Sequence, residues 1–178
     1  MSRHVPTINT SRTTLRAMRP CDFDRFAEIW TDEAVVRYIG GEPRSRDTSW
    51  KVFLQIAGHW QVTGFGQWAI EAHETGTIVG QTGFFLGARG LGDDFDSVPE
   101  AGWVLAPEAQ GRGLAAEAVC AAHDWFDRVI TGPLVCMIDP DNETSLKLAE
   151  QLGYTGMRTA EYGGGTVHLM SRRTPPLI

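Results

Sequence analysis

The sequence contains no apolar run that approaches the roughly 20 residues of a membrane-spanning helix. Its N-terminus also lacks the apolar core of a signal peptide. Only three cysteines occur, Cys21, Cys120 and Cys136, with no CxxC pair and no nearby pair of histidines. We therefore expect a soluble cytoplasmic protein in a reducing compartment, with no membrane partner, no disulfide framework and no metal.

An excess of basic residues is also missing. The 16 Lys and Arg residues are outnumbered by 22 Asp and Glu, which gives a formal net charge of −6 and an isoelectric point of about 5.3. Proteins that bind nucleic acid need a basic surface that displaces counterions, so no nucleic-acid partner is expected. The acidic balance fits a neutral or cationic ligand better.

The composition is that of a folded domain. Apolar residues make up 42% of the 178 residues and charged residues 21%, close to the average of soluble globular proteins. A chain of this length can bury roughly 70% of the surface of its unfolded state, so it can fold on a hydrophobic core alone. No repeat or linker divides it. We expect a flexible N-terminal arm at residues 1–12 and a single domain at residues 13–178.

Hydrophobic periodicity predicts both strands and helices. Helices are expected from Pro20, at residues 35–39, around residues 50–60 with Asp47 or Thr48 as the N-cap, and at residues 114–129 and 142–152. Strands are expected at residues 13–18, 65–73, 77–86, 100–105, 134–138, 154–162 and 166–171. The expected fold class is α+β (mixed α/β), a mixed sheet with helices on its faces.

A loop is expected at residues 87–99, and it contains three aspartates, Asp93, Asp94 and Asp96. A solvated turn is the simpler interpretation of this cluster. A calcium site is the alternative, although no EF-hand spacing follows the aspartates.

The most informative segment joins the strand at 100–105 to the helix at 114–129. Its turn contains Gly111 and Gly113, which let the backbone approach a phosphate because they carry no side chain. The first N–H groups of the helix have no partner within the helix, and the helix dipole favours an anion at this end. Arg112 is expected to add a charge-assisted contact. The segment therefore predicts a phosphate-binding turn.

Two common phosphate-binding motifs fit this turn poorly. A Walker loop needs Lys after the glycine, whereas Leu114 follows Gly113. Residues 111–116 match a loose GxGxxA dinucleotide pattern, but residues 106–110 separate the strand from the first glycine, too many for that tight turn. A nucleotide-binding oxidoreductase is kept as a minor alternative.

The same turn resembles motif A of the GNAT acetyltransferase superfamily, Q/R-x-x-G-x-G/A, through Gln110, Gly113 and Ala115. Residues 142–145 (Asn-Glu-Thr-Ser) and 152–154 (Leu-Gly-Tyr) resemble later segments of that family. Residues 15–24 resemble the start of the branch that contains the ribosomal-protein N-terminal acetyltransferases (RimJ/RimL-like). The resemblance covers roughly residues 13–172. It implies a mostly antiparallel central sheet with helices on both faces and a splayed pair of parallel strands, 100–105 and 134–138.

The resemblance also implies acetyl-CoA as the cosubstrate and no metal. The pantetheine arm would pair with backbone groups of one strand edge, the pyrophosphate would rest on the amides of the turn, and a side-chain amide would bind the arm near the thiol. The residues implied to bind acetyl-CoA are Trp103, Leu105, Gln110, Gly111, Arg112, Gly113, Leu114, Ala115 and Asn142.

Acetyl transfer from a thioester to an amine requires a base, a donor to the developing oxyanion and a proton for the thiolate. The backbone N–H of Trp103 or its neighbour is expected to be the oxyanion donor. Glu100 is the candidate base, and anchoring of the substrate ammonium is its alternative role. Ser145 is the candidate general acid by its family position, and a local helix cap is its alternative. Cys136 is expected in the core, because no base that would activate it is recognisable.

The resemblance favours an N-acetyltransferase that moves an acetyl group from acetyl-CoA to a primary amine by direct attack in a ternary complex. A catalytically silent CoA-binding or regulatory module is the alternative. We expect a small-molecule or peptide amine as acceptor, and the acidic loop favours a cationic one. A homodimer is considered as the assembly. Four aromatic residues are expected near the acceptor, and the alternative is that they belong to the hydrophobic core: Trp30, Tyr38, Trp68 and Phe84.

Overall fold

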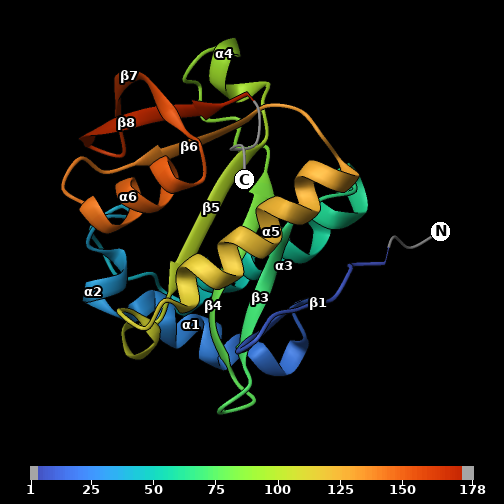
Figure 1. Cartoon of the computed structure of the whole chain (residues 1–178). Coiled ribbons are helices and arrows are strands. Elements are labelled where there is room, and N and C mark those ends of the chain that lie inside the picture. The colour runs from blue at the N-terminus through green and yellow to red at the C-terminus, as the bar shows by residue number, and fades with distance from the viewer. Residues whose placement is uncertain (1–3, 174–178) are drawn as a thin grey trace.

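The computed structural model describes residues 4–173, and the parts of the predicted arm and domain at residues 1–3 and 174–178 lie outside the described residues. Figure 1 shows the arrangement of the elements. Their order is β1 (Ile8–Asn9), β2 (Thr13–Arg16), the 3-10 turn Pro20–Asp22, α1 (Phe23–Thr31), α2 (Glu33–Val36), α3 (Arg46–Thr63), β3 (Gln67–Ala72), β4 (Ile78–Phe85), α4 (Asp93–Asp96), β5 (Glu100–Leu105), the 3-10 turn Pro107–Ala109, α5 (Leu114–Val129), β6 (Leu134–Ile138), α6 (Glu143–Gln151), β7 (Thr155–Tyr162) and β8 (Gly165–Arg172).

The strands form one sheet in the order β1-β2-β3-β4-β5-β6-β8-β7. Within residues 4–173 every neighbouring pair is antiparallel except β5 and β6, which are parallel. β5 pairs with β4 along its whole length, but it shares only the register pair Glu100–Val135 with β6. The predicted fold class is therefore confirmed, and the two parallel strands separate after their first contact.

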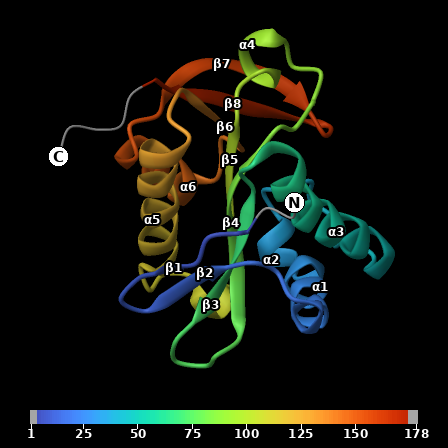
Figure 2. The ribbon, with the colours of Figure 1, turned by 90° about the vertical axis from the view of Figure 1, so that its right-hand side faces the viewer.

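Helices cover both faces of the sheet, with α5 and α6 on one side and α1, α2 and α3 on the other (Figure 2). Phe126 of α5 packs on Phe84 of the sheet, with ring centroids 4.5 Å apart. On the opposite face Phe26 and Trp30 of α1 pack together with Phe53 of α3.

On α1 the helical period predicts a buried face of Phe23, Phe26, Ala27 and Trp30, and the last three are buried. On α3 the predicted face of Trp50, Phe53, Leu54, Ala57 and Trp60 is only partly right. Phe53 and Trp60 are buried, but Trp50, Leu54 and Ala57 are exposed, because the buried face runs through Ile56 instead.

Two local features differ from the sequence-based expectation. The N-cap of α3 is Ser45, whose hydroxyl accepts the N–H of Thr48 at 3.2 Å, and not Asp47 or Thr48. The expected loop at residues 87–99 contains the short helix α4. Its Asp96 carboxylate accepts the backbone N–H groups of Arg89, Leu91 and Gly92. Because backbone donors already occupy this carboxylate, it organises the loop and does not form a calcium site.

The N-terminal segment packs more closely than the flexible arm expected at residues 1–12. β1 pairs with β2, and the indole N–H of Trp68 donates to the carbonyl of Pro6 at 2.8 Å. Val5 and Ile8 pack against the main core. The sequence does not indicate this, because the partner of the segment lies about sixty residues away.

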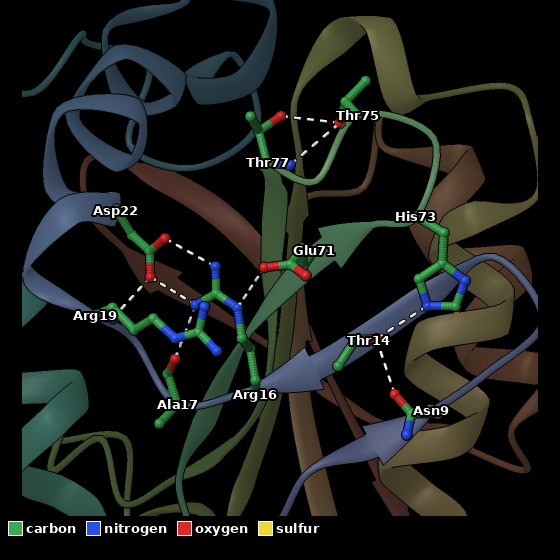
Figure 3. Close-up of polar contacts among 10 residues, drawn as sticks. All are labelled: Asn9, Thr14, Arg16, Ala17, Arg19, Asp22, Glu71, His73, Thr75 and Thr77. Carbon is green, nitrogen blue, oxygen red and sulfur yellow. Dashed lines mark hydrogen bonds and ion pairs between the residues drawn. The ribbon is translucent and has the colours of Figure 1, made fainter.

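A buried ion cluster fixes the start of α1 to the sheet (Figure 3). Arg16 of β2 donates to both carboxylate oxygens of Asp22, at 2.7 and 2.9 Å. Its Nε donates to Glu71 of β3 at 2.6 Å. Asp22 in turn accepts the backbone N–H of Arg19 at 2.7 Å. Since Arg16 and Asp22 are both buried, this cluster anchors the first helix to two strands.

Candidate functional site

A cavity of about 640 Å³ opens where β5 and β6 separate. Residues 100–104 of β5 form one wall. Residues 136–139, which follow the point where β6 separates from β5, form the opposite wall. The cavity continues through the gap to the face of the sheet that α1 and α3 cover, where Trp30 and His59 line it. A ligand in this cavity would therefore reach both faces of the sheet.

One edge of β5 is open toward this cavity. The N–H of Ala106 donates to the carbonyl of Val79, so the alternation of the antiparallel ladder directs every second residue of β5 toward β4. Trp103 and Leu105 consequently direct their backbone groups toward the gap. This is the edge on which the sequence places the pantetheine arm, and the N–H and C=O of Trp103 are available there.

Gln110 connects the end of β5 to the turn that follows. Its side-chain amide donates to the carbonyl of Leu105 at 2.9 Å. Of the two Leu105 backbone groups, the carbonyl is therefore engaged within the chain, and the N–H is the one left for a ligand. The side chain of Gln110 thus holds the backbone at the end of β5, a structural contact that the motif alone does not indicate.

The turn itself has the conformation that its glycines predict. Gly111 and Gly113 have φ angles of +69° and +74°, and Gly113 is the N-cap of α5. Within residues 4–173, the backbone N–H groups of residues 111–116 reach no acceptor, and the first helical bond at this end runs from Glu117 to the carbonyl of Gly113. A row of free amides at a helix N-terminus is a binding site for an anion.

Arg12 holds this turn in place, although nothing in the sequence singles out this residue. Its Nη1 donates to the carbonyl of Arg112 at 2.8 Å, and its Nε pairs with Glu117 at 2.7 Å. Its own backbone N–H also donates to Glu117. No spacing signal could have found this contact, since Arg12 lies in the segment expected to be a flexible arm.

Arg112 is engaged by a carboxylate of the neighbouring hairpin. Its guanidinium pairs with Glu74 at 2.7 Å, and both side chains are exposed. Glu74 belongs to the β3–β4 hairpin loop. The expected contact of Arg112 with a phosphate would require this surface pair to open, which costs little because water screens the charges of an exposed ion pair.

Asn142 and Ser145 line the cavity across from β5. The side-chain oxygen of Asn142 caps α6 by accepting the N–H of Ser145 at 3.1 Å. The Ser145 hydroxyl accepts the indole N–H of Trp103 at 3.2 Å. The local cap is thus Asn142 and not the Ser145 hydroxyl, which keeps its own proton free to donate into the cavity.

Glu100 lies in the cavity wall but is bound by an arginine. Arg89 donates to both of its carboxylate oxygens, at 2.6 and 2.8 Å, and also to the hydroxyl of Tyr162 at 2.8 Å. The Glu100 side chain is only 5% exposed. Burial raises the pKa of Glu100 above its usual value, and the hydrogen bonds from Arg89 oppose that rise.

Cys136 also lines the cavity, and burial raises the pKa of its thiol far above the usual value. It therefore carries its proton at neutral pH. Among the described residues no group of three or more His, Cys, Asp or Glu side chains is arranged to hold a metal ion. In the same part of the chain, no helix has the length and apolar character needed to cross a membrane.

The four aromatic residues expected near the acceptor divide into two pairs. Trp30 and Tyr38 line the cavity, whereas Trp68 and Phe84 are fully buried in the core. The acidic loop contributes none of its aspartates to the cavity lining, and its Asp94 pairs with Arg158.

Comparison with known proteins places this architecture in context. The sequence model described as "Acetyltransferase (GNAT) domain" matches residues 12–155. A GNAT-family acetyltransferase structure from Bordetella pertussis is 31% identical with a TM-score of 0.84, covering 94% of this chain and 99% of that one. An acetyltransferase structure from Agrobacterium tumefaciens str. C58 is 29% identical with a TM-score of 0.82, covering 98% of both chains. An N-acetyltransferase named p20 from Bacillus licheniformis is 27% identical over 152 residues, 84% of this chain and 83% of the relative.

Proposed function

The chain belongs to the GNAT acetyltransferase family, and from this premise we propose that it transfers the acetyl group of acetyl-CoA to a primary amine. The observation that carries the proposal is the gap between β5 and β6, which exposes a strand edge beside a cavity that reaches both faces of the sheet. An open edge on one side and an acceptor space on the other suit two substrates that meet in the middle.

The described residues fit acetyl-CoA as the cosubstrate. The free amides of residues 111–116 suit its pyrophosphate, with Arg112 as a further contact and Gln110 positioning the turn. The Trp103 backbone and the Leu105 N–H suit the pantetheine arm, and Asn142 lies across the gap from them. When bound, acetyl-CoA would supply the activated acetyl group.

The residues of this chain supply the remaining chemistry. The carbonyl of Trp103 is left to the pantetheine arm, and its backbone N–H is the proposed donor to the oxyanion, because a fixed N–H stabilises the charge that develops there. Ser145 is the proposed donor of a proton to the thiolate. Direct attack by the amine is supported by Cys136, whose buried, protonated thiol makes a poor nucleophile.

The proposed role of Glu100 is to receive the amine. Its carboxylate lies in the cavity wall, where it serves either as base through a water or as the anchor of the ammonium group. The bidentate pair with Arg89 fixes its orientation and leaves its outer lone pairs to accept a proton or a hydrogen bond. Both roles require the same position, and kinetics distinguish them.

The comparisons leave the acceptor open. Structures named as a ribosomal-protein-serine acetyltransferase and as a spermidine N-acetyltransferase in complex with CoA and spermine, both from Vibrio cholerae, are each 19% identical to this chain. At that identity they share the fold alone. Membership of the RimJ/RimL-like branch therefore stays a proposal that rests on residues 15–24, and a peptide α-amine stays a candidate acceptor.

The proposed activity is tested by measuring free thiol released from acetyl-CoA in the presence of a panel of amines. We expect amine-dependent release and an acetylated amine in the products. Tight CoA binding without release for any amine would favour the catalytically silent module. Stabilisation by NAD in place of CoA would favour the oxidoreductase alternative.

The role of Glu100 is tested with Glu100→Gln. We expect turnover to be lost while acetyl-CoA still binds, because the amide can neither accept the proton nor pair with an ammonium group. Loss of kcat at unchanged KM would identify the base, whereas a raised KM with kcat kept would identify the anchor. Full activity across the pH range would remove Glu100 from both roles. Ser145→Ala is the companion variant for the general acid, with a loss of kcat expected at unchanged acetyl-CoA affinity.

A further inference from the structure

The acceptor side of the cavity carries more positive than negative charge. Arg37, Arg44 and Arg89 line it, and Glu100, which Arg89 already holds, is the carboxylate among them. Asp139 lines the far wall beyond the gap, where its side chain accepts the backbone N–H of Asp141. Neither Arg37 nor Arg44 forms an ion pair with any residue of the described chain. Two positive charges therefore face this part of the cavity without an anionic partner among the described residues.

Arg44 is the more informative of the two. Its guanidinium lies flat over the indole of Trp30, 3.4 Å from the ring centroid. One of its terminal nitrogens, Nη1, is completely buried and has no hydrogen-bond partner in the described structure. Burial without a nearby anion lowers the pKa of Arg44 to about 10. The fold thus holds a desolvated cation in place at the wall of a cavity.

Arginines on the neighbouring helices α1 and α3 are satisfied, whereas Arg44 lies in the segment before α3. Arg25 pairs with Glu28, and Arg46 pairs with Asp24 across to α1. A buried guanidinium with an empty donor site is costly, since such groups are normally paired or hydrogen-bonded. Stacking on Trp30 returns part of that cost but uses none of the N–H donors. Nη1 itself is closed to a ligand, but Nε and Nη2 have no hydrogen-bond partner among the described residues and remain available at the cavity wall for a ligand that carries an oxyanion.

A series of contacts links Arg44 to the strand with the open edge. The indole N–H of Trp30, on which Arg44 stacks, donates to the side chain of Gln81 at 3.2 Å. Gln81 is the register partner of Val104, the residue next to Trp103. The cation therefore lies beside the segment of β5 where acetyl transfer is proposed. One small molecule can place an amine at the gap and an anionic group on Arg44.

We infer that Arg44 binds an oxyanion of the acceptor, so that the acceptor is an amine that also carries a carboxylate or a phosphonate-like group. This inference rests on the proposed acetyltransferase function and names its substrate class. It differs from the cationic amine that the acidic sequence loop favours, because that loop contributes none of its aspartates to the cavity lining. A guanidinium binds such oxyanions through two parallel hydrogen bonds, which also fixes the orientation of the amine.

The test compares pairs of amines that differ only in the acidic group. The panel contains the common amino acids, their amides and their decarboxylated amines, together with β-alanine, 2-aminoethylphosphonate and spermidine. We expect kcat/KM to be at least about 10-fold higher for the acidic member of a productive pair. β-Alanine against 2-aminoethylphosphonate distinguishes a carboxylate from a phosphonate.

Arg44→Gln should raise KM for the acidic amines by about 10- to 100-fold while kcat changes little, because the lost contact lies away from the reacting atoms. Arg44→Lys keeps the charge but loses the paired donors, so it should recover only part of the affinity. Arg46→Gln is the matched control, since Arg46 is an exposed arginine at the start of α3 that does not line the cavity. A structural role is measured separately: because Arg44 is an unpaired buried cation, Arg44→Gln should not lower the melting temperature of the free protein.

Several results would overturn the inference. One is equal use of the acidic amines and their matched neutral partners, and another is an unchanged KM in Arg44→Gln; in both cases acetyl transfer would stand and only the substrate class would fall. If no amine releases thiol, binding still decides. Acidic amines should raise the melting temperature of the wild-type protein with CoA but not that of Arg44→Gln. Equal shifts in the two proteins, or none in either, would contradict an oxyanion site at Arg44.

Discussion

At the scale of single residues, the Arg16 cluster shows how much one carboxylate contributes. Although burial works to raise the pKa of Asp22, hydrogen bonds from Arg16 and Arg19 lower it below its usual value. Asp22→Asn removes this anion and leaves Arg16 with Glu71 as its carboxylate partner and the carbonyl of Ala17 as a further acceptor. We expect the free energy of unfolding to fall by about 3 kcal/mol, measured by urea denaturation.

Asp24→Asn is the control for this prediction. Asp24 pairs with Arg46 at the surface, where both side chains are more than half exposed. Its loss should change stability by less than about 1 kcal/mol. If Asp22→Asn and Asp24→Asn lowered the free energy of unfolding by similar amounts, the burial of the Asp22–Arg16 pair would add nothing to its contribution to stability.

His123 provides a prediction about pH. Its Nδ1 contacts the carbonyl of Val119 at 2.8 Å, so Nδ1 carries the hydrogen and Nε2 accepts from the hydroxyl of Tyr154 at 2.9 Å. Burial lowers the pKa of His123 from 6.5 to about 4. Since the folded pKa lies below the unfolded one, the neutral form stabilises the fold above about pH 6.5, and this stability is lost as the pH falls to about 4.

We expect the free energy of unfolding to fall by up to about 3 kcal/mol across this window, beyond the loss from carboxylates. His123→Gln cannot ionise and should show a shallower pH dependence between pH 6.5 and 4. Parallel curves for the wild type and His123→Gln would mean that His123 is not the group responsible.

The sequence predicts residues of this scale unevenly. Gly113 and Asn142 can be proposed as cofactor contacts from the sequence, because each belongs to a local motif whose chemistry is set by neighbours within a few positions, and these roles stay predictions. Arg44 and Arg12 carry no such signal. Their importance comes from Trp30, Glu117 and the carbonyl of Arg112, which only the folded chain brings to them.

At the scale of the elements, the strand–turn–helix from β5 to α5 is the unit that the sequence predicted best. The predicted bounds of the strand (100–105) and of the helix (114–129) agree with the structure. They could be predicted because the hydrophobic pattern changes from the period of a strand to that of a helix at the two glycines of the turn. The N-terminal segment was predicted less well. It is too short and polar to show a period, and its order derives from contacts with Trp68 and α5.

Substitution of Gly113 tests this unit. Gly113 has a φ of +74°, and a side chain there costs roughly 1–2 kcal/mol. We expect Gly113→Val to remain folded but to lose acetyl-CoA binding, measured by calorimetry, because the free amides of the turn change direction. Gly90→Val is the matched control: Gly90 also has a φ of +74° with open space around it, but it lies in the loop before α4. Unchanged affinity in Gly113→Val would defeat the phosphate-turn assignment.

At the scale of the whole molecule, the sheet consists of two parts that meet at one register pair. β1–β5 form one part and β6–β8 the other, and Glu100–Val135 joins them. Both parts contribute side chains to the core on which α5 packs. Arg172 of β8 pairs with Asp127 of α5 and contacts the carbonyl of Leu152 after α6. The cleft can therefore stay open while both parts of the sheet pack on one core.

A ligand that fills this gap should bridge the two parts and stabilise the protein as a whole. At a hundredfold excess of acetyl-CoA over its dissociation constant, we expect the free energy of unfolding to rise by about 2.7 kcal/mol. Hydrogen exchange should slow most at the amides of Trp103 and Leu105, which have no partner strand opposite them, while β2 and β3 change only with global stability. NAD is the control and should produce neither effect. A rise in stability without protection at Trp103 and Leu105 would mean that acetyl-CoA binds elsewhere on the molecule, because only a ligand paired with that strand edge can shield those two amides.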